Sequence, residues 1–386
     1  MVQAAPATVD LVYFNAGGGH RASALALQEA IARRGWPWTV RLVNLFEVLD
    51  PQDTFRRLTG FAPEAIYNQR LARGWTLGLA QELKLLQAAI RYAHPTLVRL
   101  LRAHWAASEP DLVVSLVPNF NRAMGEAVAE ALPGVPYVTL LTDLADHPPG
   151  FWIEPGIAQH VVCGTPRAAA QALAAGLPPQ RIHPSSGMIL RPAFYAQRLA
   201  DRATARRHLG LDPDRPTALV LFGGQGSKAM LGIAKALHDV QLVLVCGHND
   251  TLAAQLRALP ATAPRLVVGF TSDIPAYMQL ADFFIGKPGP GSVSEAVQQG
   301  LPVIVVRNTW TMPQERYNAQ WVLENGLGLV LPSFEGIAAA AAQMVAGLDG
   351  YRTAVARIDN RAVFEVPEIL ARILAGSRSE DAAAPS

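Results

Sequence analysis

Short apolar runs alternate with helical stretches along most of the chain, and this alternation predicts an α/β fold. In the first half, the runs that we interpret as buried strands are 9–14, 39–45, 111–117, 136–141 and 159–163. In the second half they are 218–222, 240–246, 283–285 and 301–306. Helical stretches follow several of these runs, as at 21–34 and 166–175. Strand–helix alternation of this kind is typical of parallel, doubly wound sheets.

The length of the chain, 386 residues, suggests two domains. We expect the linker between them near 194–201. Residues 367–374 are predicted to form a short helix with a proline in its first turn. The polar tail 377–386 is predicted to be disordered.

Residues 53–91 interrupt the α/β pattern. They mix apolar and aromatic side chains with arginine and lysine, which suits short helices at a membrane surface. The same aromatic side chains could equally form an ordinary core.

Composition narrows the class of protein. The net charge of +2 gives no nucleic-acid footprint, and the two cysteines, Cys163 and Cys246, lie far apart in apolar runs. No zinc spacing or disulfide framework is present, which fits a reducing cytoplasm. We see no signal peptide and no apolar stretch of about 18 residues, so we expect no membrane-spanning helix. The sequence does not indicate an oligomeric state.

A Gly/Pro turn between two apolar runs carries the strongest chemical signal. Residues 286–291 read Gly-Lys-Pro-Gly-Pro-Gly and precede a helix that we expect to open at Ser292 and end at Gly300. A helix start presents unpaired N–H groups and the positive end of its dipole, so it favours a phosphate. Glu295 could complete a capping box with Ser292, or its carboxylate could bind a pair of sugar hydroxyls.

Two further glycine loops follow predicted strands. Residues 15–20, Asn-Ala-Gly-Gly-Gly-His, match neither a dinucleotide fingerprint nor a P-loop, and His20 could simply bond within its loop. Residues 223–227, Gly-Gly-Gln-Gly-Ser, form a phosphate-type loop ahead of a helix. Asp143 and His147 follow another strand, where ligands of open α/β sheets collect. Asp212 and Asp214 have the spacing of a metal-binding pair, but their prolines favour a plain turn.

Several of these segments together resemble one enzyme family. Gly-Lys-Pro-Gly-Pro-Gly-Ser-Val-Ser-Glu-Ala, followed by Gly-Leu-Pro-Val-Ile, resembles the nucleotide-sugar signature of monogalactosyldiacylglycerol synthases and processive diacylglycerol glucosyltransferases. It is similar, more distantly, to the N-acetylglucosaminyltransferase of peptidoglycan synthesis. Gly-Gly-Gly-His-Arg-Ala-Ser, the Thr-Asp and His-Pro pairs with Trp152, and Gly187 to Phe194 match the same family. The matches occur in order between about residues 11 and 330.

The resemblance implies a GT-B fold, with two facing Rossmann-like domains and the reaction in the cleft between them. It implies an acceptor-binding domain at 1–198 with a membrane-facing insertion near 53–91, a UDP-sugar-binding domain at 199–360, and a helix at 361–376 that packs back on the first domain. The implied reaction moves galactose or glucose from a UDP-sugar to a lipid such as diacylglycerol, with inversion. The implied partners are a UDP-sugar, a lipid acceptor and an anionic membrane, with the protein peripheral on the cytoplasmic face.

The resemblance also implies site residues. For the UDP-sugar these are Gly223, Gly224, Gln225, Gly226, Ser227, Phe270, Thr271, Lys287, Gly289, Pro290, Gly291, Ser292, Glu295, Gln314 and Glu315. Glu295 would hold the ribose, residues 270–271 the uracil, and 314–315 the sugar. On the acceptor side it implies Gly18, Gly19, His147, Trp152 and Arg191. His20 and Asp143 would be catalytic, and which of them is the base stays open. No metal or other cofactor is expected, because Lys287 and the helix starts would offset the diphosphate charge.

Two departures from the family pattern put the identity of the sugar in doubt more than that of the nucleotide: Pro288 stands where alanine is usual, and Pro313 where glycine is usual. His248 also stands where the family often has arginine. The alternatives are an N-acetylglucosamine transferase acting on a polyprenyl-linked acceptor, a UDP-sugar 2-epimerase, and a non-catalytic nucleotide-sugar-binding protein.

Overall fold

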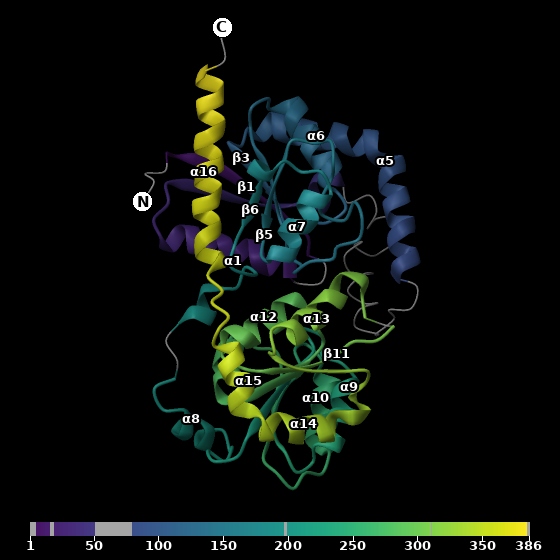
Figure 1. Cartoon of the computed structure of the whole chain (residues 1–386), viewed down its shortest axis with the longest axis vertical. Coiled ribbons are helices and arrows are strands. Elements are labelled where there is room, and N and C mark those ends of the chain that lie inside the picture. Colours follow the sequence, from purple (N-terminus) through teal and green to yellow (C-terminus); the bar gives the residue numbers. More distant parts are fainter. Residues whose placement is uncertain (1–4, 16–18, 51–78, 197–198, 310, 384–386) are drawn as a thin grey trace. The chain divides into compact units, whose positions relative to one another are not determined.

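A computed structural model of the chain describes residues 5–15, 19–50, 79–196, 199–309 and 311–383, of which 79–82 and 378–383 are described by their backbone alone. The chain divides into two compact units (Figure 1). Among the described residues, unit 1 runs to residue 192 and resumes at 361, whereas unit 2 covers 193–360. The expected boundary at 198/199 therefore lies a few residues later than the observed one.

Unit 1 contains a six-stranded sheet in the order β2-β1-β3-β4-β5-β6, and every pairing in it is parallel. Its strands are β1 (Ala7–Tyr13), β2 (Trp38–Asn44), β3 (Leu112–Ser115), β4 (Tyr137–Leu140), β5 (Gln159–Cys163) and β6 (Ile182–Pro184). Its helices are α1 (Gly19–Arg33), α2 (Leu45–Leu49), α5 (Leu79–Ser108), α6 (Asn121–Ala131), α7 (Pro166–Ala174) and α16 (Ala362–Ala383). The 3₁₀ turns η1 (Pro179–Arg181) and η2 (Pro192–Tyr195) follow α7 and β6.

One face of this sheet is covered by α5 and α6. Trp105 and Leu101 of α5 are fully buried against Val12, Val113 and Met124. The strands β3 and β4 are buried at every position, which explains why they read as continuous apolar runs.

Unit 2 repeats the architecture with the order β12-β11-β10-β7-β8-β9, again parallel throughout. Its strands are β7 (Thr217–Leu221), β8 (Gln241–Val245), β9 (Arg265–Val268), β10 (Phe283–Gly286), β11 (Val303–Val306) and β12 (Gly328–Leu331). Its helices are α8 (Arg202–His208), α9 (Ala229–Ala236), α10 (Asp250–Ala258), α11 (Ile274–Leu280), α12 (Pro290–Gln298), α13 (Arg316–Glu324), α14 (Ile337–Ala346) and α15 (Leu348–Val355). Two 3₁₀ turns, η3 (Pro313–Glu315) and η4 (Phe334–Gly336), precede α13 and α14.

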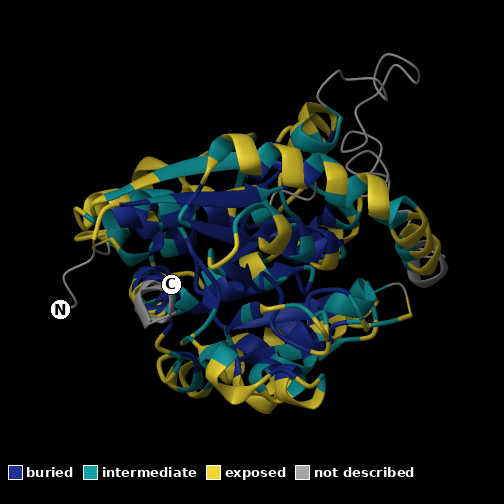
Figure 2. Ribbon diagram, turned by 90° about the horizontal axis from the view of Figure 1, so that it is seen from above, coloured by how far each residue is buried: buried dark blue, intermediate teal, exposed yellow. Residues whose placement is uncertain are grey.

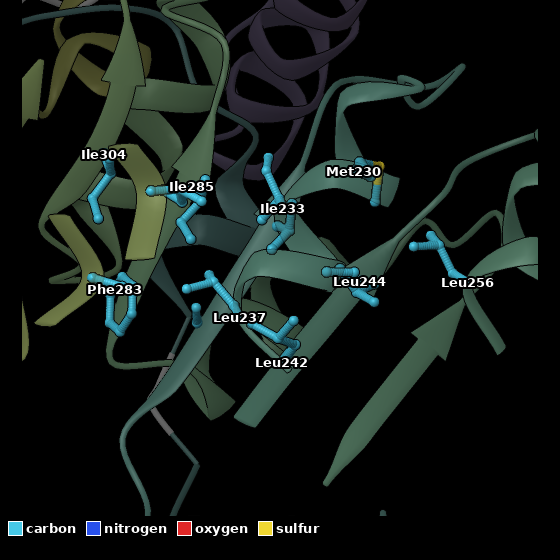
Figure 3. Packing of buried hydrophobic residues seen from close by; sticks show 14 of the residues in the cluster. Met230, Ile233, Leu237, Leu242, Leu244, Leu256, Phe283, Ile285 and Ile304 are labelled. Atoms are coloured by element: carbon cyan, nitrogen blue, oxygen red, sulfur yellow. The ribbon is translucent and has the colours of Figure 1, made fainter. Parts of the chain in front are cut away.

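The core of unit 2 lies between its sheet and helices α9, α10 and α14. Met230 and Ile233 of α9, and Leu237 directly after it, share one buried cluster with Leu242 and Leu244 of β8 (Figure 3). The inner strands of each sheet are mostly buried, whereas the edge strands β2, β6, β9 and β12 are mostly of intermediate exposure, and exposed residues lie on the outer faces of the helices (Figure 2). Each unit therefore owns a hydrophobic core.

The structure changes three expectations about helices. Helix α12 begins at Pro290 with Gly289 as N-cap and no side-chain cap, so the expected capping box of Ser292 and Glu295 is wrong. Pro290 occupies the first helical position because its fixed φ suits that place and its missing N–H is not needed there.

The last helix is the second of these changes, because α16 runs from Ala362 to Ala383. It thus includes Pro367 in its interior and continues through most of the tail for which we expected disorder. It belongs to unit 1, where Arg34, directly after α1, forms an ion pair with Glu368 at 2.9 Å. Third, of the expected insertion at 53–91, residues 53–78 lie outside the described residues, and the rest forms the start of the single long helix α5.

A single carboxylate in unit 2, that of Asp282, binds three arginine side chains. Its carboxylate, 9% exposed, accepts hydrogen bonds from Arg206 at 2.6 Å and Arg202 at 2.8 Å, and forms an ion pair with Arg352. Burial alone would raise the pKa of Asp282, but the surrounding arginines together hold this pKa below its usual value. The contact joins α8, α15 and the start of β10.

Replacing Asp282 with asparagine should destabilise unit 2. Arg206, whose side chain is 4% exposed, would lose its carboxylate, and we expect a loss of about 3–5 kcal/mol in the free energy of unfolding at pH 7. Because the pKa of Asp282 is lowered on folding, its contribution exists above the unfolded pKa and disappears as pH falls through the folded value. The difference between wild type and Asp282→Asn should therefore shrink in acid, measured by urea denaturation at several pH values.

Asp212→Asn is the matched control, because Asp212 forms an exposed pair with Arg215 at 3.5 Å and should change stability by less than about 0.5 kcal/mol. Equal, small losses for the two variants would show that the arginines do not depend on Asp282.

Candidate functional site

Four loops with predicted site residues, and a fifth that carries Gly247 and His248, lie along one edge of the sheet in unit 2. Because all its strands are parallel, their carboxyl ends share this edge. In sheet order, the loops follow β11, β10, β7, β8 and β9. The order of strands along the chain reverses between β10 and β7, and ligands of open α/β sheets bind at such a switch point.

The loop after β7 is shaped by glycine. Gly223 and Gly226 have φ values of 79° and 61°, which glycine adopts without strain. A Cβ on Gly247, which follows β8, would lie 2.1 Å from the carbonyl oxygen of Gly224. Loop 223–227 therefore lies directly against the end of β8, and it leads into α9.

The loop after β10 leads into the first turn of α12. The N–H groups of Gly291 and Ser292 precede the first internal hydrogen bond of this helix, which Val293 donates to the carbonyl of Gly289 at 3.1 Å. Lys287 Nζ lies 3.1 Å from Glu315 Oε1. A cation and a helix N-terminus thus face the same loop, which suits an anionic group.

Glu315 and Gln314 lie in η3, next to this loop. Glu315 is buried and held by Lys287, whereas the amide of Gln314 contacts the sulfur of Met312 at 3.7 Å. Asn318 is fully buried, and its amide donates to the carbonyl of Pro288 at 2.8 Å. This hydrogen bond from the buried Asn318 fixes the Gly/Pro turn, a role that the sequence alone did not suggest.

An aromatic pair marks the other end of the edge. The rings of His248 and Phe270 are stacked with centroids 3.9 Å apart and an interplanar angle of 17°. Phe270 is 63% exposed, so the stack offers an open aromatic face. Along the edge, the chemistry therefore runs from aromatic rings, through glycine loops and Lys287, to a carboxylate and an amide.

In unit 1, His20 lies at the start of α1, close to the ends of β3 and β4. Its Nδ1 is 3.1 Å from the hydroxyl oxygen of Thr142. Burial among surrounding atoms lowers the pKa of His20 to about 4, against a hydrogen bond to the backbone of Leu116 that raises it. His20 keeps part of its surface exposed, and its imidazole is neutral at physiological pH.

A histidine with the ordinary pKa of about 6.5 would suit a base at neutral pH. Burial lowers the pKa of His20 well below that value, to about 4. The side chain in contact with Nδ1 of His20 is Thr142. In the sequence Thr142 stood out only as part of a Thr-Asp motif, so this contact was not predicted.

Asp143 follows Thr142 and is buried. Its Oδ2 accepts a hydrogen bond from the indole N–H of Trp152 at 2.9 Å. The ring of Trp152 lies 6.0 Å from that of His20, centroid to centroid. The structure thus brings His20, Thr142, Asp143 and Trp152 together.

The other acceptor-side candidates are less closely grouped. His147 is 5% exposed, and burial lowers its pKa to about 4, although Asp146 nearby raises it. Neither ring nitrogen of His147 has a hydrogen-bond partner among the described residues. Arg191 is half-buried in the segment after β6, Gly19 begins α1, and Gly18 lies outside the described residues.

The two carboxylates with metal-binding spacing belong to a turn. Asp212 caps its own turn by accepting from the N–H of Asp214 at 2.9 Å, as expected for a plain turn. Within the described ranges, no three His, Cys, Asp or Glu side chains are placed to share a metal ion.

Residues 217–337 match the Glycosyltransferase family 28 C-terminal domain. The chain is also 30% identical over 344 residues to the probable monogalactosyldiacylglycerol synthase 2 of Oryza sativa subsp. japonica, covering 84% of this chain and 71% of that protein. The chain belongs to the monogalactosyldiacylglycerol synthase family. It is therefore a glycosyltransferase, and the resemblance inferred from its motifs is confirmed.

Solved structures show the fold of this synthase-family chain. MurG from Acinetobacter baumannii aligns with a TM-score of 0.60 at 15% identity, covering 94% of this chain and 98% of that one. A putative UDP-N-acetylglucosamine 2-epimerase from Listeria monocytogenes aligns equally well, with a TM-score of 0.60 at 16% identity over 97% and 98% of the two chains. The GT-B architecture predicted for the family member is confirmed, while these distant likenesses extend no further than the fold.

The neutral state of His20 can be tested directly. With a folded pKa near 4 and an unfolded value near 6.5, His20 should stay unprotonated as pH falls from 8 to 5. Its Nε2 and Nδ1 NMR shifts, assigned with His20→Gln, should change only near pH 4. A His20 midpoint near 6.5 would show that the imidazole is solvated as in a free peptide.

Proposed function

We propose that this glycosyltransferase moves a hexose from a UDP-sugar to the hydroxyl of a lipid acceptor such as diacylglycerol, with inversion at the anomeric carbon. The observation that carries the donor assignment is the order of chemical groups along the edge of unit 2. The lipid acceptor rests on the name of the rice relative, a monogalactosyldiacylglycerol synthase.

The donor would lie across the strand ends with its base at β8 and β9. The exposed Phe270 and the backbone at Thr271 suit a planar pyrimidine. The diphosphate would meet loop 223–227, the first turn of α12 and Lys287, and Glu295 in the second turn would hold the ribose. The hexose would then reach Gln314 and Glu315. These loops span about four inter-strand spacings, roughly 19 Å, which accommodates an extended ligand.

The chemistry needs a base for the acceptor and charge compensation for the leaving UDP. A neutral His20 is in the protonation state that accepts a proton, and Thr142 sets its orientation. The carboxylate of Asp143 would offset the charge of the imidazolium that forms. At the leaving group, Lys287 and the starts of α9 and α12 provide positive charge and N–H donors, so no metal is required in this proposal.

The acceptor calls for contact with a membrane, and the exposed part of α5 suits it. Leu85 is 70% exposed and Tyr92 is 92% exposed, and their seven-residue spacing puts them on one helix face. Lys84 and Arg91 are exposed beside them. Apolar and basic groups side by side favour adsorption to an anionic surface. None of the helices in the described part of the chain has the length and hydropathy that crossing a bilayer requires.

Transfer of labelled hexose from UDP-galactose or UDP-glucose to diacylglycerol tests the proposed function. We expect activity with one of these donors, and we expect it to persist in EDTA. Glu295→Ala should weaken UDP binding by about 1.5–3 kcal/mol, through loss of charge-assisted hydrogen bonds, in calorimetry on the folded protein.

Glu335→Ala, at an exposed position in η4, is the control for Glu295→Ala. Labelling only with UDP-N-acetylglucosamine and a polyprenyl-linked acceptor would overturn the diacylglycerol assignment. Epimerisation without any acceptor would overturn the transferase, and UDP affinity unchanged in Glu295→Ala would remove Glu295 from the ribose site.

Membrane binding by α5 can be measured with vesicles. The protein should bind anionic vesicles reversibly and be partly released by high salt, because contacts from Lys84 and Arg91 are screened. Leu85→Ser combined with Tyr92→Ser should weaken binding about tenfold or more. Leu323→Ser, at a residue 50% exposed in unit 2, should leave it unchanged. Equal binding of both variants would place the membrane contact elsewhere.

A further inference from the structure

The connection between β4 and β5 has no helix. Residues 141–158 join two parallel strands, a connection that usually contains a helix satisfying its own backbone groups. Here the backbone is irregular, yet Leu144, Ala145 and Trp152 are almost fully buried. Buried peptide groups in such a segment need partners from elsewhere.

Side chains provide these partners. The hydroxyl of Thr165 donates to the carbonyl of Leu144 at 2.6 Å. The amide of Gln171 both accepts from the N–H of His147, at 3.1 Å, and donates to its carbonyl, at 2.8 Å. The crossover is thus held at fixed points by side-chain hydrogen bonds.

The carbonyl of Trp152 is held most firmly. It accepts from the amide of Asn121 at 3.1 Å and from the amide of Gln159 at 2.9 Å. Both amides are fully buried, and both are fixed in turn: Tyr137 donates to Asn121 Oδ1 at 2.6 Å, and Gln159 Oε1 accepts from the N–H of Glu154 at 3.0 Å.

The indole of Trp152 connects these buried amides to the candidate site residues His20 and Asp143. The side chain is 0% exposed, its ring packs against Phe151 and His20, and its N–H donates to Asp143 Oδ2 at 2.9 Å. The buried amides of Asn121 and Gln159 are therefore linked through one rigid aromatic residue to the carboxylate of Asp143.

We propose that Trp152 is a positioning residue for Asp143, and that Asn121 and Gln159 act as an amide clamp that holds Trp152 in place. The proposal rests on the proposed function, in which Asp143 serves the base His20. The indole bond has two effects: it fixes one carboxylate oxygen, and it stabilises the ionised form of Asp143 relative to the protonated form. None of these three residues, Trp152, Asn121 and Gln159, needs to touch substrate in this role.

Unit 2 contains a comparable clamp that serves no site residue. Gln241 opens β8 as Gln159 opens β5, and its amide donates to Asp212 and Thr217 while accepting from the N–H of Asp212 at 2.7 Å. Its loop precedes β7, at the end of the sheet opposite to the candidate donor site. A Gln241 variant therefore measures the stability that is lost when a buried glutamine is replaced at a place remote from the candidate site.

The decisive experiment is a carboxyl ¹³C NMR titration of Asp143 in the ligand-free chain, assigned with Asp143→Asn. In Trp152→Phe, which keeps an aromatic ring but removes the N–H, the Asp143 midpoint should rise by about 1–2 pH units. Trp105→Phe is the control, because Trp105 is equally buried and its indole nitrogen has no partner among the described residues. It should leave the midpoint in place.

The titration needs no substrate, so it is informative even if the proposed function is wrong. An unchanged Asp143 midpoint in folded Trp152→Phe overturns the positioning role. If that variant does not fold, Trp152→benzothienylalanine, which exchanges the N–H for sulfur in a ring of the same shape, replaces it. Absence of hexose transfer by the wild type would instead refute the proposed function alone.

Turnover provides the second measurement. Trp152→Phe and Gln159→Met should lower kcat about 10–100-fold, with KM for the UDP-sugar within about twofold, and in Trp152→Phe the acid limb of the kcat profile should move to higher pH. Gln241→Met should lose similar stability and keep its kcat. Equal losses of kcat in Gln159→Met and Gln241→Met would show that Gln159 acts on stability only.

Discussion

The parallel pairing of the strands is the constraint on which both candidate sites depend. A parallel sheet sends every strand in the same direction, so the loops after all its strands collect at one edge. Residues as far apart in sequence as Gly223 and Glu315 are brought to one edge of unit 2 for this reason alone. In unit 1 the same rule brings His20, after β1, beside Thr142, after β4.

Close packing of loops along such an edge restricts the residues that can occupy it. Adjacent strand ends are about 4.8 Å apart, so neighbouring loops have little room for side chains. Gly247 illustrates the limit, since any Cβ there would meet the carbonyl of Gly224. The connection between β4 and β5 has no helix, so its buried peptide groups need other hydrogen-bond partners. Buried side-chain amides provide several of them. In unit 2, Gln241 makes comparable hydrogen bonds to the backbone of Asp212, although helix α8 precedes that turn.

Local sequence patterns predicted nine of the twelve strands in the described residues and the glycine loops, but not contacts between loops. Apolar runs predicted the buried strands, whereas β6, β9 and β12, which are mostly not fully buried, were missed, and the Gly/Pro turn at 286–291 predicted an anion site. The start of α12 was misplaced because proline at a first helical position reads as a breaker. The pair Lys287–Glu315 and the bond from Asn318 to Pro288 join segments that are distant in sequence, so no spacing rule could have indicated them.

The lowered pKa of His20 shows why its neighbours matter more than its own chemistry. Burial disfavours the imidazolium, so a neutral His20 is easily maintained but gains a proton only with help. Thr142 can orient the ring, yet a hydroxyl carries no charge to offset the one that forms. A carboxylate can, and Asp143 is the next residue along the same loop. Its capacity to remain ionised while buried depends on donors such as the indole of Trp152. The strength of the proposed base is thus set by a crossover that lies outside the regular secondary structure.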